Sequence, residues 1–306
     1  MMMEVRHHRI GVDLGGTKIE AAVVAADNRI LWRERVATPS GDYHGTLHAI
    51  HALVERAVAE NRLSADLPVG IGVPGSQSPR TGLMRGCNSV ALNDKPLLHD
   101  LQVALARPVK LANDADCFAL SEACAGVGRE AGTVFGAILG TGVGGGIVIR
   151  QQLLSGPNHN AGEWGHNAMP GDSVQGRKVR RCFCGRENCI ETWLSGTGLG
   201  NSFREAGLNV QATQAGIELM RKNDPLAQAV WRDYVQLLAR ALSVVINIID
   251  PDVVVLGGGV SNVDELYRDV PALWEQWIFS DVVRTRLLKA ECGDSSGVIG
   301  AAWLWP

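Results

Sequence analysis

The sequence has no long run of charges of one sign, no apolar stretch of membrane-spanning length and no apolar segment near its start. Its 29 basic and 32 acidic side chains leave a net charge of −3, which argues against nucleic-acid binding as the main role. The longest apolar stretches have the length of strands and are interrupted by glycine, so no transmembrane helix is expected. The opening MMMEVRHHRI lacks the apolar core of a signal peptide.

Cysteine is infrequent, and the seven cysteines fall into two groups. Cys87, Cys117, Cys124 and Cys292 are scattered through apolar surroundings, where a free thiol behaves as a small hydrophobe. The other three are close together in RCFCGRENCIE, residues 181–191. Free thiols without a signal peptide predict the reducing cytoplasm, which disfavours a disulfide. The cluster therefore leaves redox chemistry or a metal site as its main alternatives.

Two glycine-rich turns are similar to each other. RIGVDLGGTKIEAAVV (residues 9–24) and FGAILGTGVGGGIVI (residues 135–149) each predict a strand, a turn and a second strand. When the two are aligned, Gly15 corresponds to Gly140, and Asp13 corresponds to Ile138. This weak internal repeat predicts two related α/β halves.

Each turn offers backbone N–H groups that suit a phosphate oxyanion, although two plain hairpins are the alternative. The candidate nucleotide-binding residues are Asp13, Gly15, Gly16, Thr17, Lys18, Gly140, Thr141 and Gly142, with Gly257, Gly258 and Gly259 after a later apolar strand. Neither turn matches the Walker or the Rossmann pattern. Asp13 ends a buried strand beside a turn, where a carboxylate could hold a hydrated Mg²⁺.

Strands alternate with helices along the chain, which predicts α/β layers with largely parallel pairing. The expected strands lie near residues 9–14, 18–25, 29–36, 69–75, 109–114, 252–256 and 282–289. The expected helices lie near residues 43–60, 97–106, 115–125, 226–249 and 263–278. The segment 155–190, which contains all three clustered cysteines, is expected to be rich in loops.

Five motifs occur in the order found in the ROK family of sugar kinases and sugar-responsive repressors: DLGGTK, NDAD, GTGVGGG, AGEWGH and CFCGRENCIE. The resemblance implies an actin-like (ribonuclease H-like) ATPase fold with two α/β domains around a central cleft. We expect a small domain of residues 1–113 plus 292–306, and a large domain of residues 114–291 with a zinc-binding loop.

Within that family the chain is most similar to bacterial fructokinases, which implies transfer of the γ-phosphoryl group of ATP to the 6-hydroxyl of fructose. The stretches VPGSQSPRTGL, CIETWLSGTG and GDSSGVIGAAWLWP carry this likeness. The alternatives are an N-acetylglucosamine kinase or a glucose or mannose kinase of the same family. The resemblance also implies ATP, Mg²⁺, a structural zinc ion and a homodimer.

The resemblance assigns a role to each motif. Asp114 becomes the base that accepts the sugar hydroxyl proton, for which a helix cap is the structural alternative. The implied sugar-binding residues are Gly75, Asn88, Asn113, Asp114, Glu163, His166 and Glu191. The implied ligands of a closed structural zinc site are His166, Cys182, Cys184 and Cys189.

A sugar-sensing repressor of the same family is the alternative from another functional class. Such repressors carry a helix-turn-helix module ahead of the kinase-like part. About ten residues precede the first predicted strand, too few for that module. The sequence therefore favours an enzyme.

Overall fold

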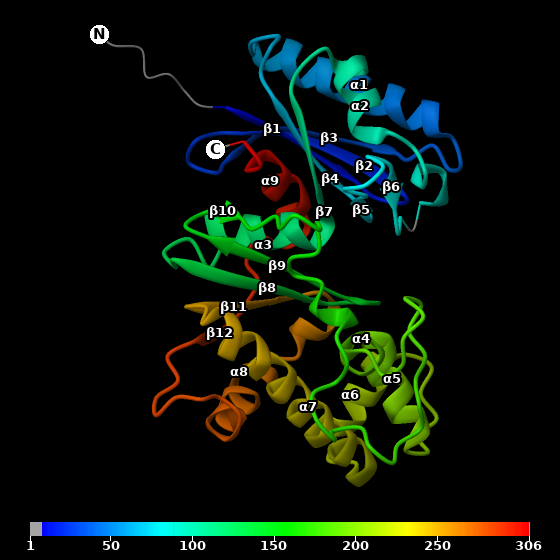
Figure 1. Cartoon of the computed structure of the whole chain (residues 1–306), viewed down its shortest axis with the longest axis vertical. Coiled ribbons are helices and arrows are strands. Elements are labelled where there is room, and N and C mark those ends of the chain that lie inside the picture. Colours follow the sequence, from blue (N-terminus) through cyan, green and yellow to red (C-terminus); the bar gives the residue numbers. More distant parts are fainter. Residues whose placement is uncertain (1–7, 88, 306) are drawn as a thin grey trace. The chain divides into compact units, whose positions relative to one another are not determined.

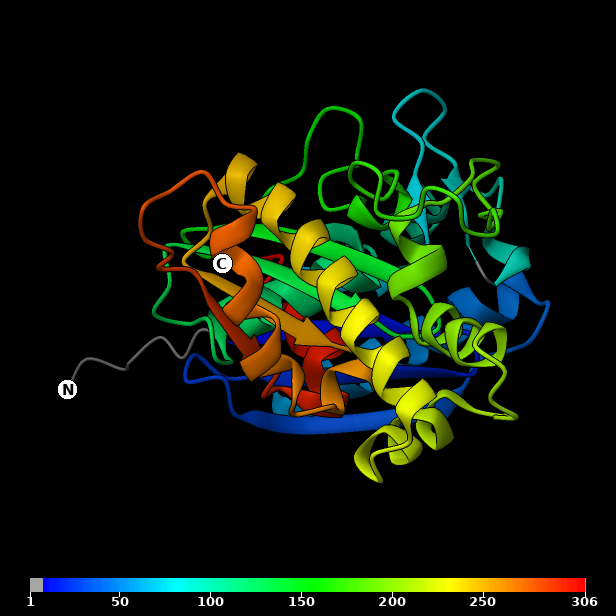
Figure 2. The same ribbon diagram turned by 90° about the horizontal axis from the view of Figure 1, so that it is seen from below.

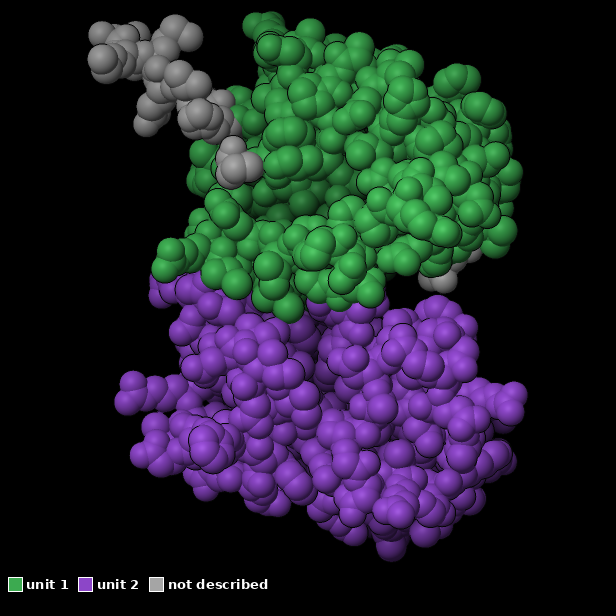
Figure 3. All heavy atoms as spheres, in the orientation of Figure 1, with its two compact units in different colours: residues 1–129, 146–161, 291–306 green, residues 130–145, 162–290 purple. Residues whose placement is uncertain are grey.

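The computed structural model describes residues 8–87 and 89–305, which form two compact units. Unit 1 comprises residues up to 129 together with 146–161 and 291 onwards, and unit 2 comprises 130–145 and 162–290 (Figure 3). These units differ from the predicted domains, because unit 1 also contains residues 114–129, 146–161 and 291, which were expected in the large domain.

The core of unit 1 is a five-stranded sheet of order β3-β2-β1-β4-β7. Its strands are β1 (Arg9–Leu14), β2 (Lys18–Val24), β3 (Ile30–Ala37), β4 (Val69–Val73) and β7 (Val109–Asn113). Strands β1, β2 and β3 pair antiparallel, whereas β4 is parallel to β1 and β7 is parallel to β4. All five residues of β4 are buried, as expected for a central parallel strand, while the edge strand β3 alternates between half-buried and exposed residues.

Helices cover both faces of this sheet (Figure 1). Helices α1 (Tyr43–Asn61) and α2 (Leu97–Leu105) lie on one face, and α9 (Ser296–Ala302) lies on the other with α3 (Asp114–Cys124) packed against it. The smaller elements of unit 1 are β5 (Ser76–Gln77), β6 (Met84–Arg85), η1 (Val90–Leu92), β10 (Gln152–Leu153) and η5 (Gly293–Ser295).

Two glycines allow α9 to lie directly on its neighbours. A Cβ atom on Gly300 would stand 1.7 Å from the carbonyl oxygen of Cys117 in α3. A Cβ atom on Gly70 would stand 1.8 Å from the carbonyl oxygen of Ala301. Backbone therefore meets backbone at both contacts, with no flexible side chain that could move aside.

We expect Gly300→Ala to lower the free energy of unfolding by about 1–3 kcal/mol or more, because the added methyl group overpacks the contact between α3 and α9. Urea unfolding followed by circular dichroism measures this change. Gly156→Ala is the matched control, since a Cβ atom there would meet nothing within 4 Å. Equal stability of the two variants would contradict the packing argument.

Unit 2 contains β8 (Thr133–Leu139), β11 (Val253–Gly257), β12 (Arg286–Lys289) and the first residues of β9 (Val143–Ile149). The second sheet has the order β10-β9-β8-β11-β12, in which β11 is parallel to both β8 and β12. The helical elements of unit 2 are η2 (Trp164–His166), α4 (Ile190–Leu194), α5 (Gly196–Glu205), α6 (Thr213–Arg221), α7 (Pro225–Ile249), η3 (Gly259–Asn262), α8 (Leu266–Asp269) and η4 (Pro271–Gln276).

Helix α7 is the longest element and lies over strands of the second sheet (Figures 1 and 2). Its start is set by Asp224, whose side chain accepts a hydrogen bond from the backbone N–H of Ala227, and by Pro225 in the first turn. No helix in the described part of the chain is both long and apolar enough to cross a membrane.

Two expected elements are shorter in the structure. The helix expected over 263–278 is the short α8 followed by the 3₁₀ helix η4, because Pro271 has no N–H to continue the hydrogen-bonding pattern. The strand expected over 282–289 is formed only by Arg286–Lys289, the residues that pair with Val253–Leu256 of β11.

Candidate functional site

The first glycine turn joins β1 to β2 as a tight hairpin. The backbone N–H of Gly15 donates to the carbonyl oxygen of Lys18 at 2.9 Å, and the hydroxyl of Thr38 donates to the carbonyl oxygen of Gly15 at 2.8 Å. Gly16, Thr17 and Lys18 are exposed at the tip. The turn is therefore a hairpin whose exposed backbone suits an anion. A plain hairpin and a phosphate-binding turn, the two alternatives from the sequence, are thus compatible.

Asp13 lies immediately before this turn in an acidic environment. It is half-buried and stands opposite Glu20 in the β1–β2 register. Burial, followed by the charges of Glu20 and Asp114, raises the pKa of the Asp13 carboxyl. A Cβ atom on Gly297 would stand 2.6 Å from an Asp13 oxygen, so a larger side chain there would displace the carboxylate. Glu20 is itself paired with Arg35, so Asp13 and Asp114 are the carboxylates whose charge a divalent cation would offset, and these two fit Mg²⁺.

Asn113, rather than Asp114, caps helix α3. The Asn113 side-chain oxygen accepts a hydrogen bond from the backbone N–H of Asp116 at 2.7 Å. Asp114 is the first residue of the helix, and its carboxyl accepts from the N–H of Ala115 at 2.9 Å. The capping role that was the alternative for Asp114 is therefore filled by its neighbour.

The Asp114 carboxyl reaches solvent but is surrounded by enough protein to be partly desolvated. Desolvation raises the pKa of this carboxyl, and its hydrogen bond from the Ala115 N–H opposes that rise. A carboxylate with a raised pKa is a better proton acceptor than an ordinary aspartate.

Gly75 lies beside the loop that leads to residue 88. Its φ is +88°, and a Cβ atom on it would stand 2.5 Å from the carbonyl oxygen of Arg85 and 2.8 Å from the sulfur of Cys87. Asn93 holds the same loop by accepting from the N–H of Cys87 at 2.9 Å and donating to its carbonyl oxygen at 3.0 Å. The predicted sugar contact Asn88 lies outside the described residues.

In unit 2, three glycine-containing segments meet at the second turn. The N–H of Gly140 donates to the carbonyl oxygen of Gly142 at 3.0 Å. The N–H of Gly196 donates to the carbonyl oxygen of Gly140 at 2.7 Å. The hydroxyl of Thr197 donates to the carbonyl oxygen of Thr141 at 3.0 Å.

Gly258, with φ +81°, completes this group, since a Cβ atom on it would lie 2.6 Å from the carbonyl oxygen of Leu139. Gly257 ends strand β11, where it pairs with Ile138, and Gly259 begins η3. Gly196 and Thr197 were absent from the predicted nucleotide-binding residues, although the glycines of LSGTG are a signal of the same kind.

The four predicted metal ligands come together in unit 2. One ligand atom from each of His166, Cys182, Cys184 and Cys189 lies within 4.8 Å of all the others. The Cys184 and Cys189 sulfurs are 3.7 Å apart, and the Cys182 sulfur is 3.5 Å from Nδ1 of His166. Ligands of a tetrahedral zinc ion stand about 3.5–3.8 Å from one another, given bonds of about 2.3 Å to sulfur and 2.0 Å to nitrogen. The donor set therefore fits zinc.

All seven cysteines carry free thiols in the structure. Glu191 follows the cluster in the first turn of α4 and connects it to β9. One of its carboxylate oxygens accepts from the N–H of Val143 at 2.9 Å, and the other lies 3.7 Å from the Cys182 sulfur.

The loop that carries Glu163 and His166 is also held against β9. Trp164 is buried, and its indole N–H donates to the carbonyl oxygen of Gly144 at 2.9 Å. A Cβ atom on Gly165 would stand 2.2 Å from the carbonyl oxygen of Val143. The half-buried Glu163 immediately precedes these anchored residues, so its position is set by theirs.

Comparison with known proteins places the chain among sugar kinases. An N-acetylgalactosamine kinase of Shewanella sp. is 37% identical over 96% of this chain and 95% of its own length. An N-acetyl-D-glucosamine kinase of Salmonella paratyphi B is 38% identical over 96% of this chain and 98% of its own length.

Solved structures agree in fold. The ROK hexokinase of Thermus thermophilus has a TM-score of 0.86 at 29% identity and covers 97% of each chain. A ROK glucokinase of Streptomyces griseus, solved with glucose and an ATP analogue (AMPPNP), has a TM-score of 0.72 at 28% identity, with 97% of this chain and 98% of that one covered. These likenesses confirm the expected actin-like ATPase fold. The model of the ROK family matches residues 9–306, and the chain therefore belongs to the ROK family.

Proposed function

We propose that this protein is an ATP-dependent kinase that phosphorylates the 6-hydroxyl of an N-acetylhexosamine. The observation that carries the proposal is the near full-length match to two N-acetylhexosamine kinases at 37% and 38% identity. The fructokinase likeness expected from the sequence is not supported by these relatives, and the alternative named beside it is the better one. Glucose and mannose remain competing acceptors, because the solved ROK structures include a hexokinase and a glucokinase.

Asp114 is the proposed general base. It accepts the proton of the sugar hydroxyl as that oxygen attacks the γ-phosphorus of ATP, and the bond from phosphorus to the bridging oxygen of ADP breaks. Because Asn113 caps helix α3, the Asp114 carboxylate does not serve as the cap. The Asn113 oxygen is occupied by the Asp116 N–H, so its amide nitrogen is the part that can donate to sugar.

The glycine turns and Asp13 are proposed to bind the nucleotide and its metal. The backbone of residues 15–18 and of residues 140–142 would contact phosphate oxygens or the nucleoside. Asp13 would hold Mg²⁺, which neutralises charge on the transferring phosphoryl group. Gly196 and Thr197 join the proposed set because they bond directly to the second turn.

The Cys₃His cluster is proposed to hold a structural zinc ion that shapes a segment with little apolar core. His166 faces Cys182 with Nδ1, so its Nε2 can serve a sugar hydroxyl. One carboxylate oxygen of Glu191 accepts a hydrogen bond from the Val143 N–H, and the other can accept from a sugar hydroxyl. Glu163, on the anchored loop, is a further proposed sugar contact, and Gly75, Asn113 and Asp114 complete the proposed set.

The substrate proposal is tested by coupled measurement of ADP release with N-acetylglucosamine, N-acetylgalactosamine, glucose, mannose and fructose. We expect kcat/KM for one of the two N-acetylhexosamines to exceed that for fructose by about tenfold or more. A higher kcat/KM for fructose would overturn the choice of sugar, and no turnover with any hexose would overturn the enzyme. The expected homodimer stays a prediction, which sedimentation of the purified protein tests.

A further inference from the structure

Arg180 lies two residues before the first cysteine of the cluster, and its side chain is directed into the protein rather than into solvent. Only 8% of the side chain is exposed. The guanidinium lies 3.8 Å from the centre of the buried Trp193 ring. Burying a charged group is costly unless it is paired, so the contacts made by this guanidinium decide what it does.

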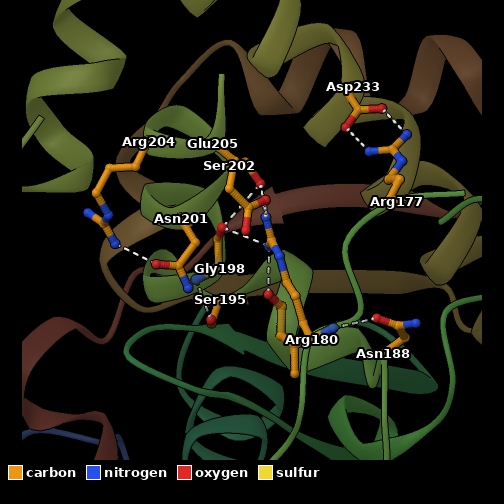
Figure 4. Close-up of polar contacts among 11 residues, drawn as sticks. Arg177, Arg180, Asn188, Ser195, Gly198, Asn201, Ser202, Arg204, Glu205 and Asp233 are labelled. Carbon is orange, nitrogen blue, oxygen red and sulfur yellow. Dashed lines mark hydrogen bonds and ion pairs between the residues drawn. The ribbon is translucent and has the colours of Figure 1, made fainter. Parts of the chain in front are cut away.

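Those contacts all go to the segment that contains α4 and α5 (Figure 4). Nη1 donates to the carbonyl oxygens of Thr192 at 2.8 Å and Gly198 at 3.0 Å. Nη2 donates to the hydroxyl of Ser202 at 3.0 Å and to the carboxylate of Glu205 at 2.7 Å. The planar guanidinium thus binds the first and last turns of α5 at once, which the compact ammonium of a lysine could not do.

The backbone of the same residue holds the cysteine loop. The N–H of Arg180 donates to the side-chain oxygen of Asn188 at 3.0 Å, and the N–H of Asn188 donates to the carbonyl oxygen of Arg180 at 2.8 Å. Arg180 and Asn188 therefore join the two sides of the loop that contains Cys182 and Cys184, and Cys189 follows Asn188 directly. One residue connects that loop to α5.

The start of α5 is the part that lies against the second glycine turn. Ser195 caps the helix by accepting from the N–H of Gly198 at 2.9 Å, and Gly196 and Thr197 bond to Gly140 and Thr141. The Gly198 carbonyl oxygen, held by Arg180, belongs to the same first turn of the helix. Movement of this turn would change the position of the glycine backbone at residues 140–142.

We propose that Arg180 is a positioning residue that holds the first turn of α5 against the glycine turn at residues 140–142. By holding that turn in place, Arg180 maintains the affinity for the nucleotide, and its backbone links this effect to the cysteine loop. The proposal rests on the proposed function, because it takes that turn as a nucleotide contact. Arg180 itself touches no substrate in this account. Its effect is transmitted through Gly198 and the helix start.

The test compares Arg180→Met with Arg177→Met in the full-length protein. Arg177 also lies near the Trp193 ring, at 5.6 Å, and is paired with Asp233 of α7 at 2.7 Å, but among the described residues it has no hydrogen bond or ion pair to α5. Calorimetry measures the affinity for AMPPNP with Mg²⁺ and, separately, for N-acetylglucosamine, while elemental analysis measures zinc.

We expect Arg180→Met to weaken AMPPNP binding by about tenfold, with sugar affinity within about twofold of the wild type and zinc retained. Arg177→Met should leave all three values near those of the wild type. Arg180→Lys should lie between, because an ammonium cannot reach both pairs of acceptors, and it replaces the Met variant if that one does not fold. Equal losses of nucleotide, sugar and zinc would show a merely structural role and overturn the proposal, as would unchanged AMPPNP affinity.

The wild-type measurements separate this proposal from the proposed function. Wild-type protein that binds AMPPNP but phosphorylates no hexose would refute the kinase assignment and leave the Arg180 comparison intact. Wild-type protein that does not bind AMPPNP would refute both.

Discussion

Asp114→Asn is expected to lower the turnover number by about 10²-fold or more, the scale of losing a general base, with sugar affinity nearly unchanged. The amide keeps the size of the side chain and can still accept from the Ala115 N–H, but it cannot take the hydroxyl proton. Steady-state kinetics and sugar calorimetry on the same preparation measure the two effects. Near-normal turnover in this variant would remove Asp114 from the base role.

Asp116→Asn is the matched control, because Asp116 lies in the same first turn of α3 and the proposed mechanism uses only its backbone N–H. We expect its turnover number to stay within about threefold of the wild type, a small effect beside the loss of a general base. A loss as large as that of Asp114→Asn would mean that the turn as a whole, rather than one carboxylate, matters.

The same carboxylate predicts a pH dependence. A base must be ionised, and desolvation raises the pKa of Asp114 above its ordinary value of 3.8. The value of kcat/KM should therefore fall as the pH drops through that raised pKa, at a higher pH than for an unperturbed carboxylate. The residual activity of Asp114→Asn should lack this acidic limb, and an unchanged limb in the variant would assign it to another group.

Cys184→Ala is expected to lose the bound zinc and most of the sugar affinity together. The variant removes one of four ligands whose donor atoms lie within 4.8 Å of one another, and the same cluster carries His166 and adjoins Glu191. Elemental analysis should find about one zinc ion per chain in the wild type and far less in the variant, as expected for a closed four-ligand site.

Cys292→Ala is the control for this loss, because Cys292 is a half-buried thiol in unit 1 and is not part of the cluster. Its zinc content and sugar affinity should equal those of the wild type. Undiminished zinc in Cys184→Ala would contradict the ligand assignment, and full sugar affinity without zinc would separate the metal from sugar binding.

Features carried by neighbouring residues could be predicted from the sequence. The first glycine turn forms the expected hairpin because its hydrogen bond joins Gly15 to Lys18, three positions along the chain. The spacing of Cys182, Cys184 and Cys189 places three thiols on one short loop, and the resemblance to ROK proteins supplied His166 as the fourth ligand.

Features that depend on contacts between distant segments could not be predicted in this way. The bond between Gly196 and Gly140 joins residues far apart in the chain, and nothing in either motif specifies it. The buried contacts of Arg180 are similar, since an arginine beside another arginine in a polar loop is typical of a solvated surface. Pro271, by contrast, was a visible local signal against a continuous helix over 263–278.

The choice of sugar was the least predictable feature. The motifs that identify the family contain the glycine turns, the candidate base and the metal ligands, and a kinase for any hexose needs all of these. Discrimination between fructose and an N-acetylhexosamine depends on the shape of the pocket around the acceptor and its substituents. The stretch GCNSVALND contains Asn88, one of the predicted sugar contacts, but its residue types alone do not define the shape of a pocket.

The most direct test of the proposed activity is ³¹P nuclear magnetic resonance of a reaction containing the protein, ATP, Mg²⁺ and either N-acetylglucosamine or N-acetylgalactosamine. With at least one of the two sugars, we predict that the γ-phosphate signal of ATP is replaced by signals of ADP and a phosphate monoester coupled to the protons of carbon 6. Asp114→Asn should form this product far more slowly. Inorganic phosphate as the only new product, or a sugar phosphate formed with fructose but with neither N-acetylhexosamine, would contradict the account.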